Sequence, residues 1–386
     1  MNLSDKTMTL FLTYGGSLES WEDAGLIDRE MAIYRKLLDY MGGLQVYSYG
    51  AENEKRYENI YPDTKTLLWP FSKGRRFHDR IGQWYNRHAL TSASVYKTNQ
   101  IFGAMAAVQA KRMFRKPLIV RCGYIWTVNS EKEGDRGYSL AKKKRIERRC
   151  FMEADICVVT TRRDKQEIVN THGIAENKIR IIPNYVDTEM YTPVKDSKED
   201  SVTVIFVGRL SEEKNLFNLL AAVEKTGRVD KLIMVGDGDL MAQLKTAAKG
   251  MQTKVDFLGR KPTREIPGLL RQSDIFVLPS LYEGLPKALL EAMSVGLPCL
   301  GTDVRGIRDV IKHGETGWLC ATDPEAIASG LMALIDDRDL RLRLSENARR
   351  LVEENYSLDK VTMLELDVIK EALEIGDAGH IPDGKL

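Results

Sequence analysis

Two carboxylates flank the start of a predicted helix in the stretch from Asp274 to Pro298 (DIFVLPSLYEGLPKALLEAMSVGLP). Pro286 opens the helix, so Glu283 lies in the loop before it and Glu291 just over one turn inside it. Gly284 permits close approach to the backbone, and the free amides and dipole of the first helical turn favour an anion. A ligand with phosphate in the middle and hydroxyls at both ends would fit. A nucleotide sugar has that shape.

The same residues also have an ordinary structural interpretation. Lys287 and Glu291 are four apart on the predicted helix and could form a solvated ion pair, which contributes about 0.3 kcal/mol. Glu283 could be an exposed turn residue. On this stretch alone, both interpretations remain open, because a single short motif matches by chance often enough.

The second half of the chain alternates between strands and helices around this stretch. The predicted strands are Val202–Val207, Leu232–Val235, Val255–Leu258, Asp274–Leu278 and Cys299–Gly301. Arg209 and Lys214 follow the first of them, beside the carboxyl end where open α/β sheets bind ligands. Gly236 begins a glycine turn after the second strand, but Met241 stands where a dinucleotide fingerprint needs its third glycine.

The first half opens with the same strand–helix alternation. Its predicted strands are Thr9–Thr13, Leu44–Tyr49, Leu118–Arg121, Ile156–Thr160 and Ile179–Pro183. Gly15 and Gly16 follow the first strand and either admit a ligand to the backbone or form a plain turn. Arg121 ends its strand and could contact an anionic group or form a structural salt bridge.

Length and composition predict a soluble protein of two domains. The 386 residues are too many for one ordinary core, and 43% hydrophobic with 29% charged residues is typical of globular proteins. No apolar run approaches the roughly 20 residues of a membrane helix, and the N-terminal apolar segment is too short for a signal peptide. The five cysteines are odd in number and lack metal spacing, so we expect reduced thiols in a cytoplasmic protein.

Charge is distributed unevenly along the chain. Residues 1–195 carry 32 Lys and Arg against 23 Asp and Glu, whereas the remainder carries 25 against 32. The basic first half could meet an anionic acceptor or membrane phosphates, or it could be an ordinary solvated surface. Residues 71–90 mix basic and aromatic types, which suits a membrane-interface helix as well as a partly exposed one. No nucleic-acid-binding motif accompanies them, so no nucleic-acid partner is expected.

Six motifs follow one another along the chain: IIPNYVDTEMYTP from Ile181, GRLSEEKN from Gly208, VGDGDL from Val235, FLGR from Phe257, SLYEGLPKALLEAM from Ser280 and HGETGWL from His313. In this order they resemble the retaining glycosyltransferases of family 4, which have the GT-B fold. The resemblance implies an α/β protein of two Rossmann-like domains whose parallel sheets face each other across a cleft. We place the acceptor domain at residues 1–188, the donor domain at 189–357, and a helix that returns to the first domain at 358–375.

The resemblance also implies a role for individual residues. Arg209 and Lys214 would bind the donor diphosphate, and Glu283 would hold the donor sugar, so these three form the expected catalytic set. Glu291 would accept hydrogen bonds from the ribose, and Arg260 would line the base pocket. The donor-binding residues implied in this way are Gly15, Gly16, Gly236, Arg260, Gly284, Leu285, Pro286, Lys287 and Glu291.

One departure from the family concerns the first half. Many members have a histidine at the strand end that Arg121, Cys122 and Gly123 occupy here, so no catalytic residue is transferred to this half. Arg121 is instead a candidate for binding an acceptor phosphate.

The sequence therefore predicts a retaining transferase that moves a hexose-type sugar from a UDP- or GDP-sugar to a hydroxyl group. The acceptor would be a glycan, a lipid-linked sugar or a small molecule, and an anionic acceptor would match the basic first half. Because two cations and a helix start can stabilise the leaving diphosphate, no metal and no cofactor are expected. The protein would act in the cytoplasm, with peripheral contact to the inner membrane face as a further expectation. A nucleotide-sugar epimerase or hydrolase on the same fold is the alternative.

Overall fold

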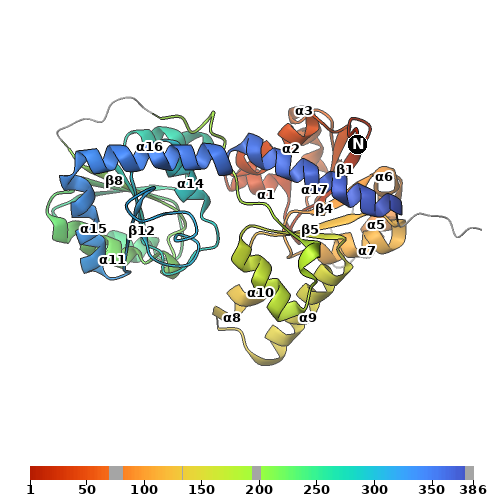
Figure 1. Ribbon diagram of the computed structural model, residues 1–386, viewed down its shortest axis with the longest axis horizontal. Helices are drawn as coiled ribbons and strands as arrows, with labels where there is room; N and C mark the ends of the chain where they lie inside the picture. Colours follow the sequence, from red (N-terminus) through yellow and green to blue (C-terminus); the bar gives the residue numbers. More distant parts are fainter. Residues whose placement is uncertain (69–80, 133, 194–200, 379–386) are drawn as a thin grey trace, which may run out of the picture. The chain divides into compact units, whose positions relative to one another are not determined.

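The computed structural model describes residues 1–68, 81–132, 134–193 and 201–378. Residues 71–80 of the segment considered for membrane contact therefore lie outside the described part. The chain divides into two compact units (Figure 1), Met1–Pro183 with Thr362–Leu386 and Asn184–Val361. These boundaries lie a few residues from those that the sequence suggests, at 188/189 and 357/358. Each unit is built around its own parallel sheet.

The first unit contains a seven-stranded sheet in the order β3-β2-β1-β4-β5-β6-β7, and every pair of neighbouring strands is parallel. The strands are β1 (Thr7–Phe11), β2 (Gly43–Tyr47), β3 (Thr64–Leu67), β4 (Val95–Thr98), β5 (Leu118–Cys122), β6 (Ile156–Val159) and β7 (Ile179–Ile181). The helices are α1 (Leu18–Asp23), α2 (Ile27–Leu38), η1 (Glu52–Lys55), α3 (Arg56–Ile60), α5 (Gln83–Tyr85), α6 (Arg87–Ser92), α7 (Ala104–Phe114), α8 (Trp126–Lys132), α9 (Gly137–Glu153), α10 (Arg162–His172) and η3 (Glu176–Lys178).

The five strands predicted for this half are confirmed within two residues at each end, but β3 and β4 escape the apolar pattern. β4 reads VYKT, and all four residues are buried, including the Lys97 side chain at 1% exposure. A charged residue in the centre of a four-residue strand breaks the apolar run by which buried strands are identified. β3 reads TKTL and is an edge strand with only one aliphatic residue.

The ammonium of Lys97 is buried because α17 (Leu358–Ala378) supplies a carboxylate against it. Lys97 Nζ lies 2.6 Å from Oε2 of Glu365, whose side chain is 4% exposed. Burial lowers the pKa of Lys97, and the adjacent Glu365 carboxylate opposes that shift. The pair attaches the last helix to the sheet of the first unit, which the chain re-enters at Thr362. The C-terminal helix predicted from residue 358 thus returns to the first unit, where this ion pair attaches it.

The second unit contains a six-stranded parallel sheet in the order β10-β9-β8-β11-β12-β13. Its strands are β8 (Thr203–Val207), β9 (Lys231–Val235), β10 (Lys254–Gly259), β11 (Ile275–Leu278), β12 (Cys299–Thr302) and β13 (Trp318–Cys320). Its helices are η4 (Glu212–Lys214), α11 (Leu216–Thr226), α12 (Met241–Ala247), η5 (Thr263–Glu265), α13 (Ile266–Arg271), α14 (Lys287–Ser294), α15 (Pro324–Asp336) and α16 (Arg338–Asn355). The five predicted strands are confirmed, and only β13 is additional.

Helices cover both faces of the second sheet. In Figure 1, α11 and α15 lie together on one side of the strands, and α14 and α16 lie together on the other. The central strands are buried on both sides, as the apolar sequence IFVL of β11 requires. One continuous apolar core fills both layers.

The cysteines and the helices agree with two simpler expectations. All five cysteines are free thiols, and four of them are buried. No helix in the described part of the chain combines the length and apolar character needed to cross a bilayer.

The buried ion pair predicts a large loss of stability when only one partner is removed. Lys97→Met leaves the Glu365 carboxylate buried without its cation, which should lower the free energy of unfolding by about 3–5 kcal/mol. Urea denaturation followed by circular dichroism measures the loss, and Lys97→Met with Glu365→Leu should recover most of it.

A more exposed pair on the same helix provides the control. Arg180 and Glu371 form an ion pair whose side chains are both 35% exposed, so Glu371→Gln should cost less than about 1 kcal/mol. If Lys97→Met and Glu371→Gln lower the free energy of unfolding equally, the buried Lys97–Glu365 pair does not attach α17 more strongly than the exposed pair does.

Candidate functional site

The chain reverses direction across the second sheet between β8 and β11. From β8 it proceeds to β9 and β10 on one side, and from β11 to β12 and β13 on the other. The loops that leave the carboxyl ends of β8 and β11 therefore diverge, and open α/β sheets bind ligands in the crevice at such a point. Arg209 and Lys214 follow β8, and Glu283 follows β11.

A direct contact joins these two loops. Lys214 Nζ donates to Oε1 of Glu283 at 2.5 Å, and the two side chains are only 16% and 11% exposed. The hydroxyl of Ser280, a fully buried residue, donates to the same oxygen at 2.7 Å. Among the described residues, both bonds go to Oε1, which leaves Oε2 to accept a hydrogen bond from a ligand. The ammonium likewise keeps donors beyond the one used on Glu283.

Backbone contacts hold the Glu283 loop in place. Glu283 N donates to the carbonyl of Arg305 at 3.1 Å, and Leu281 N donates to that of Glu213 at 2.8 Å. Gly306 has a φ of 84°, and a Cβ there would lie 1.9 Å from the carbonyl oxygen of Gly284. Nothing in the sequence indicates that the turn at Gly306 supports the Glu283 loop.

Helix α14 begins directly after this loop. Pro286 is its N-cap and makes no side-chain capping bond, so the first helical amides have no partner from the cap side chain. Asn184 Nδ2 donates to the carbonyl of Leu285 at 2.7 Å and fixes the entry to the helix. The amide donors and the helix dipole favour an anion beside Glu283, as the sequence predicts.

Two further α14 residues bear on the solvated ion pair that the sequence left open. Glu291 is only 4% exposed, so it is not part of a solvated surface pair. The ammonium of Lys287 lies 5.9 Å from the ring centroid of Tyr185, within range of a cation–π contact.

The remaining predicted residues of the second unit lie along the same edge of the sheet. Gly236 follows β9 with a φ of 135°, and a Cβ there would lie 1.8 Å from the carbonyl oxygen of Gly208. Only glycine permits this approach, which brings the turns after β8 and β9 together. Arg209 and Arg260 are both exposed. Arg260 follows β10, two strands and therefore about 10 Å from β8, which is a suitable spacing between a diphosphate and a base.

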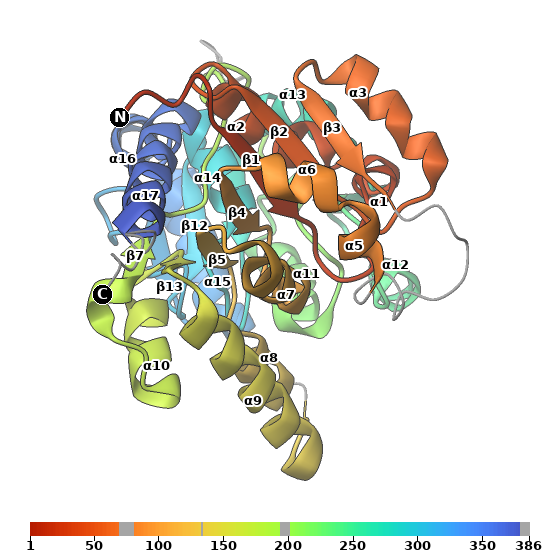
Figure 2. The same ribbon diagram turned by 90° about the vertical axis from the view of Figure 1, so that its right-hand side faces the viewer.

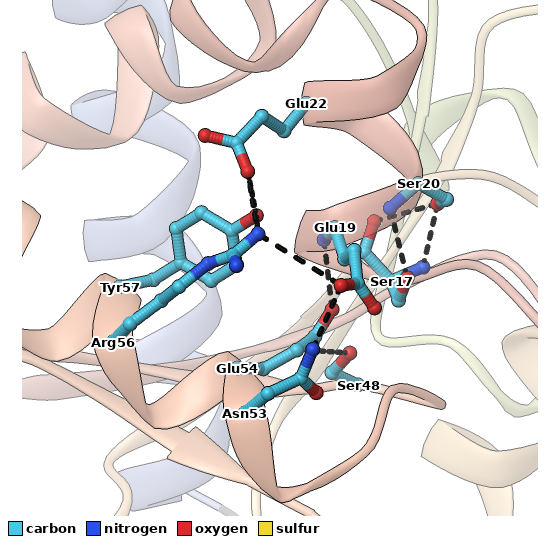
Figure 3. A network of polar contacts seen from close by, with 9 residues as sticks. All are labelled: Ser17, Glu19, Ser20, Glu22, Ser48, Asn53, Glu54, Arg56 and Tyr57. Carbon is cyan, nitrogen blue, oxygen red and sulfur yellow. Dashed lines mark hydrogen bonds and ion pairs between the residues drawn. The ribbon is translucent and has the colours of Figure 1, made fainter.

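The Gly15–Gly16 loop lies in the first unit, where a buried carboxylate holds the helix that follows it (Figure 3). Glu54 is fully buried, and its Oε1 accepts a hydrogen bond from the amide of Glu19 in the first turn of α1 at 2.8 Å. Its Oε2 accepts from the hydroxyl of Ser48. The role of Gly15 and Gly16 in donor binding stays a prediction. Glu54 carries no motif that could have identified it from the sequence.

Arg121 is half-buried in β5, and its backbone amide donates to the Thr98 hydroxyl at 3.0 Å. A Cβ on Gly123 would lie 3.2 Å from Nη1 of Arg121, so the guanidinium lies against the turn that follows its strand. Its role in acceptor binding stays a prediction. Among the described residues, no group of three or more His, Cys, Asp or Glu side chains is arranged to hold a metal ion.

Comparison with known families gives two consecutive matches. The family described as Glycosyltransferase Family 4 matches residues 44–190, and the family described as Glycosyl transferases group 1 matches residues 187–351. The second match contains every candidate residue of the second unit from Arg209 to Glu291.

Named relatives are similar over about half of their length. An Escherichia coli UDP-Gal:alpha-D-GlcNAc-diphosphoundecaprenol alpha-1,3-galactosyltransferase is 32% identical over 53% of this chain and 58% of its own. A Bacillus anthracis N-acetyl-alpha-D-glucosaminyl L-malate synthase is 32% identical over 50% of this chain and 54% of its own.

Solved structures confirm the GT-B fold over nearly the whole chain. Anabaena Alr3699/HepE in complex with UDP superimposes with a TM-score of 0.76 at 16% identity, covering 95% of this chain and 100% of that one. The same protein in complex with UDP-glucose gives a TM-score of 0.74 at 17% identity, covering 94% and 99%.

The close approach at Gly306 predicts a selective loss of stability. Gly306→Ala adds a methyl group that collides with the Gly284 carbonyl, so the Glu283 loop must move. We expect a lower midpoint of thermal unfolding, equivalent to more than about 3 kcal/mol.

Gly314→Ala is the matched control, because Gly314 has a φ of 73° but no atom within 4 Å of the added Cβ. Its backbone strain alone should cost about 1–2 kcal/mol. If the two variants unfold at the same temperature, the Gly306 contact does not support the loop.

Proposed function

Because the chain belongs to glycosyltransferase family 4, we propose that it moves a hexose-type sugar from a nucleoside-diphosphate sugar to an acceptor hydroxyl. The observation that carries the proposal is the meeting of Lys214, Glu283 and the start of α14 at the reversal point of the second sheet. These groups offer a cation, a hydroxyl-binding carboxylate and the amides of a helix start at one edge of the sheet. An activated sugar needs all three.

The chemistry of the step explains this combination. When the sugar–phosphate bond breaks, negative charge develops on the diphosphate, and preorganised positive groups lower the barrier. Lys214 is preorganised because Glu283 orients its ammonium, and the first amides of α14 need no rearrangement. Arg209 is exposed beside the same strand end and adds a second cation. Oε2 of Glu283 accepts a hydrogen bond from a hydroxyl of the donor sugar, and the Glu291 carboxylate accepts hydrogen bonds from the ribose hydroxyls.

We propose a UDP-sugar as the donor. One relative is named for UDP-Gal, and the structural neighbour HepE was crystallised with UDP and with UDP-glucose. Transfer would proceed with retention, the leaving phosphate accepting the proton of the attacking hydroxyl. Two cationic side chains and a helix start supply the charge stabilisation, so a metal ion is not needed for this step.

We propose that the acceptor is a lipid-linked sugar presented at an anionic membrane. The E. coli relative is named for an acceptor on diphosphoundecaprenol. In the first unit, one face of α9 carries Tyr138, Lys142, Arg145, Arg149 and Met152, at alternating spacings of four and three residues. Tyr138 is 85% exposed and Met152 51%, and the three cations between them are exposed. This face pairs cations with apolar ends, as helices at anionic bilayer surfaces do.

The position of α9 is consistent with such a contact. Figure 2 shows that α8 and the first half of α9 project away from the strands of the first unit. The fully buried residues of α9, Glu147, Cys150 and Phe151, lie in its second half, and Leu140 near its start is 7% exposed.

Donor binding and transfer test the proposed function. A UDP-sugar at 100 times its Kd should stabilise the fold by about 2.7 kcal/mol, which a thermal-shift screen of UDP-, GDP-, ADP- and dTDP-sugars detects. Lys214→Ala and Glu283→Gln should each lower kcat/KM by about 100-fold or more, because each removes a preorganised contact to the donor. Transfer of labelled sugar to a lipid-linked acceptor is measured in the presence of EDTA, and NMR of the product assigns its anomeric configuration.

Lys225→Ala is the control for these variants. Lys225 also pairs with a glutamate, Glu325, at 2.6 Å, but both side chains are more than half exposed, so this variant should keep full activity. Label that changes into an isomer or free sugar without any acceptor would favour an epimerase or hydrolase instead. Absence of a thermal shift with every sugar nucleotide would contradict donor binding itself.

Membrane contact predicts a charge-dependent partition. Lys142→Glu, Arg145→Glu and Arg149→Glu together should weaken co-sedimentation with phosphatidylglycerol vesicles by about 100-fold, because each basic residue near an anionic surface contributes about 1 kcal/mol. Lys245→Glu, Lys249→Glu and Arg343→Glu change the net charge equally in the second unit and should bind as the wild type does. Equal weakening by both triple variants would show a general charge effect and exclude α9 as the contact.

A further inference from the structure

A cavity lies at the opposite edge of the second sheet from the candidate donor site. Its volume is about 800 Å³, which is large enough for a small organic ligand. Its lining includes Val202, just before β8, Ile275, the first residue of β11, and Pro298, just before β12. These residues mark the amino edge of the parallel sheet, whereas Lys214 and Glu283 follow the carboxyl ends. Ile275 and Leu278 at the two ends of β11 are themselves about 10 Å apart.

The cavity combines a positive wall with an apolar floor. Six arginines line it, against three carboxylates from Asp274, Glu346 and Glu353. The arginines are Arg228, Arg271, Arg338, Arg341, Arg349 and Arg350. The apolar floor is formed by residues at the strand starts, Val202, Ile275, Leu297 and Pro298 among them. This excess of cations is unexpected in a half of the chain that carries 25 basic against 32 acidic residues.

Two of the arginines, Arg341 and Arg349, donate hydrogen bonds to backbone carbonyls of the same unit. Arg349 Nη1 donates to the carbonyl of Tyr191 at 2.6 Å and to that of Ser294 at 2.5 Å. Arg341 Nη1 donates to the carbonyls of Leu334 and Ile335 at the end of α15, at 2.6 and 2.8 Å. Backbone oxygens therefore hold both guanidinium groups, and Arg349 also pairs with the lining carboxylate Glu353, whose Oε1 lies 2.6 Å from Nε of Arg349.

Two others are available to a ligand. Arg271 Nη1 donates to the Thr192 hydroxyl at 3.2 Å, and Arg350 Nη2 donates to the side-chain oxygen of Asn347. Among the described residues, neither guanidinium pairs with a carboxylate. Each comes from a different helix, α13 or α16, so the two forks approach the cavity from separate elements. A guanidinium fork matches the geometry of a phosphate, with which it can form two parallel hydrogen bonds.

We propose that this cavity binds an organic phosphate that has an apolar part, at a site separate from the donor crevice. The phosphate would lie against Arg271 and Arg350, and the apolar part against the strand starts. Two sources supply this chemistry, an anionic phospholipid and a soluble phosphorylated compound. The inference does not depend on the proposed transfer reaction, since it uses the other edge of the sheet.

Calorimetric titration with two probes tests the site. Dihexanoyl-phosphatidylglycerol represents the lipid source and naphthyl phosphate the soluble source. At least one of them should bind the full chain, and Arg271→Gln with Arg350→Gln should weaken that binding by about tenfold or more, because charge-assisted hydrogen bonds are lost. Binding of the lipid alone assigns the site to a phospholipid, and binding of naphthyl phosphate assigns it to soluble phosphates.

Two controls separate this site from the rest of the molecule. Arg343→Gln removes an exposed arginine of α16 that does not line the cavity, and it should leave the affinity unchanged. Lys214→Ala should also leave it unchanged, whereas loss of binding in this variant would place the probe in the donor crevice and overturn the proposal. The absence of binding by both probes, or equal weakening by Arg343→Gln, would overturn it as well.

Discussion

Lys214 and Glu283 come from loops that leave neighbouring parallel strands in opposite directions, and a 2.5 Å contact between Nζ and Oε1 joins them. Without this contact, the ammonium would be a flexible, solvated charge and the carboxylate a turn residue. With it, each orients the other where a sheet reversal opens a crevice and a helix presents its first amides. The pair is largely shielded from water, so its interaction is stronger than that of an exposed pair. The glycine turns and the start of α14 place further backbone groups around this contact.

Glycine contacts allow the strand-end loops to come so close together. The carbonyl of Gly208 lies where a side chain on Gly236 would be, and the carbonyl of Gly284 lies where one on Gly306 would be. In both places, backbone packs directly against backbone, so the turns after β8 and β9 and the turns after β11 and β12 behave as two joined pairs. A rigid edge of this kind can present amides and carbonyls to a ligand without an ordering cost at each binding event.

Charges are used in different ways in different parts of the molecule. Lys97 and Glu365 are buried together, as is Glu54 against the first turn of α1, and these charges position elements. The cations of α9 are exposed along one face, and the arginines at the amino edge of the second sheet line a cavity. Net charge along the sequence describes neither arrangement. The arginine cavity lies in the acidic half, and its six arginines come from the turn after α11, from α13 and from α16, which are distant in sequence.

The sequence alone determined the strand–helix alternation and ten of the thirteen strands described, and it predicted candidate site residues after β8, β9, β10 and β11. It could do so because buried parallel strands are continuous apolar runs and because ligand residues follow their carboxyl ends. It did not reveal β4, since Lys97 in that strand is compensated by Glu365 on the last helix, a partner that the local pattern cannot show. Nor did it reveal the support of the Glu283 loop by Gly306, the hydrogen bond from the Glu19 amide of α1 to Glu54, or the arginine cavity. Those depend on contacts between residues that only the folded chain brings within a few ångströms of each other.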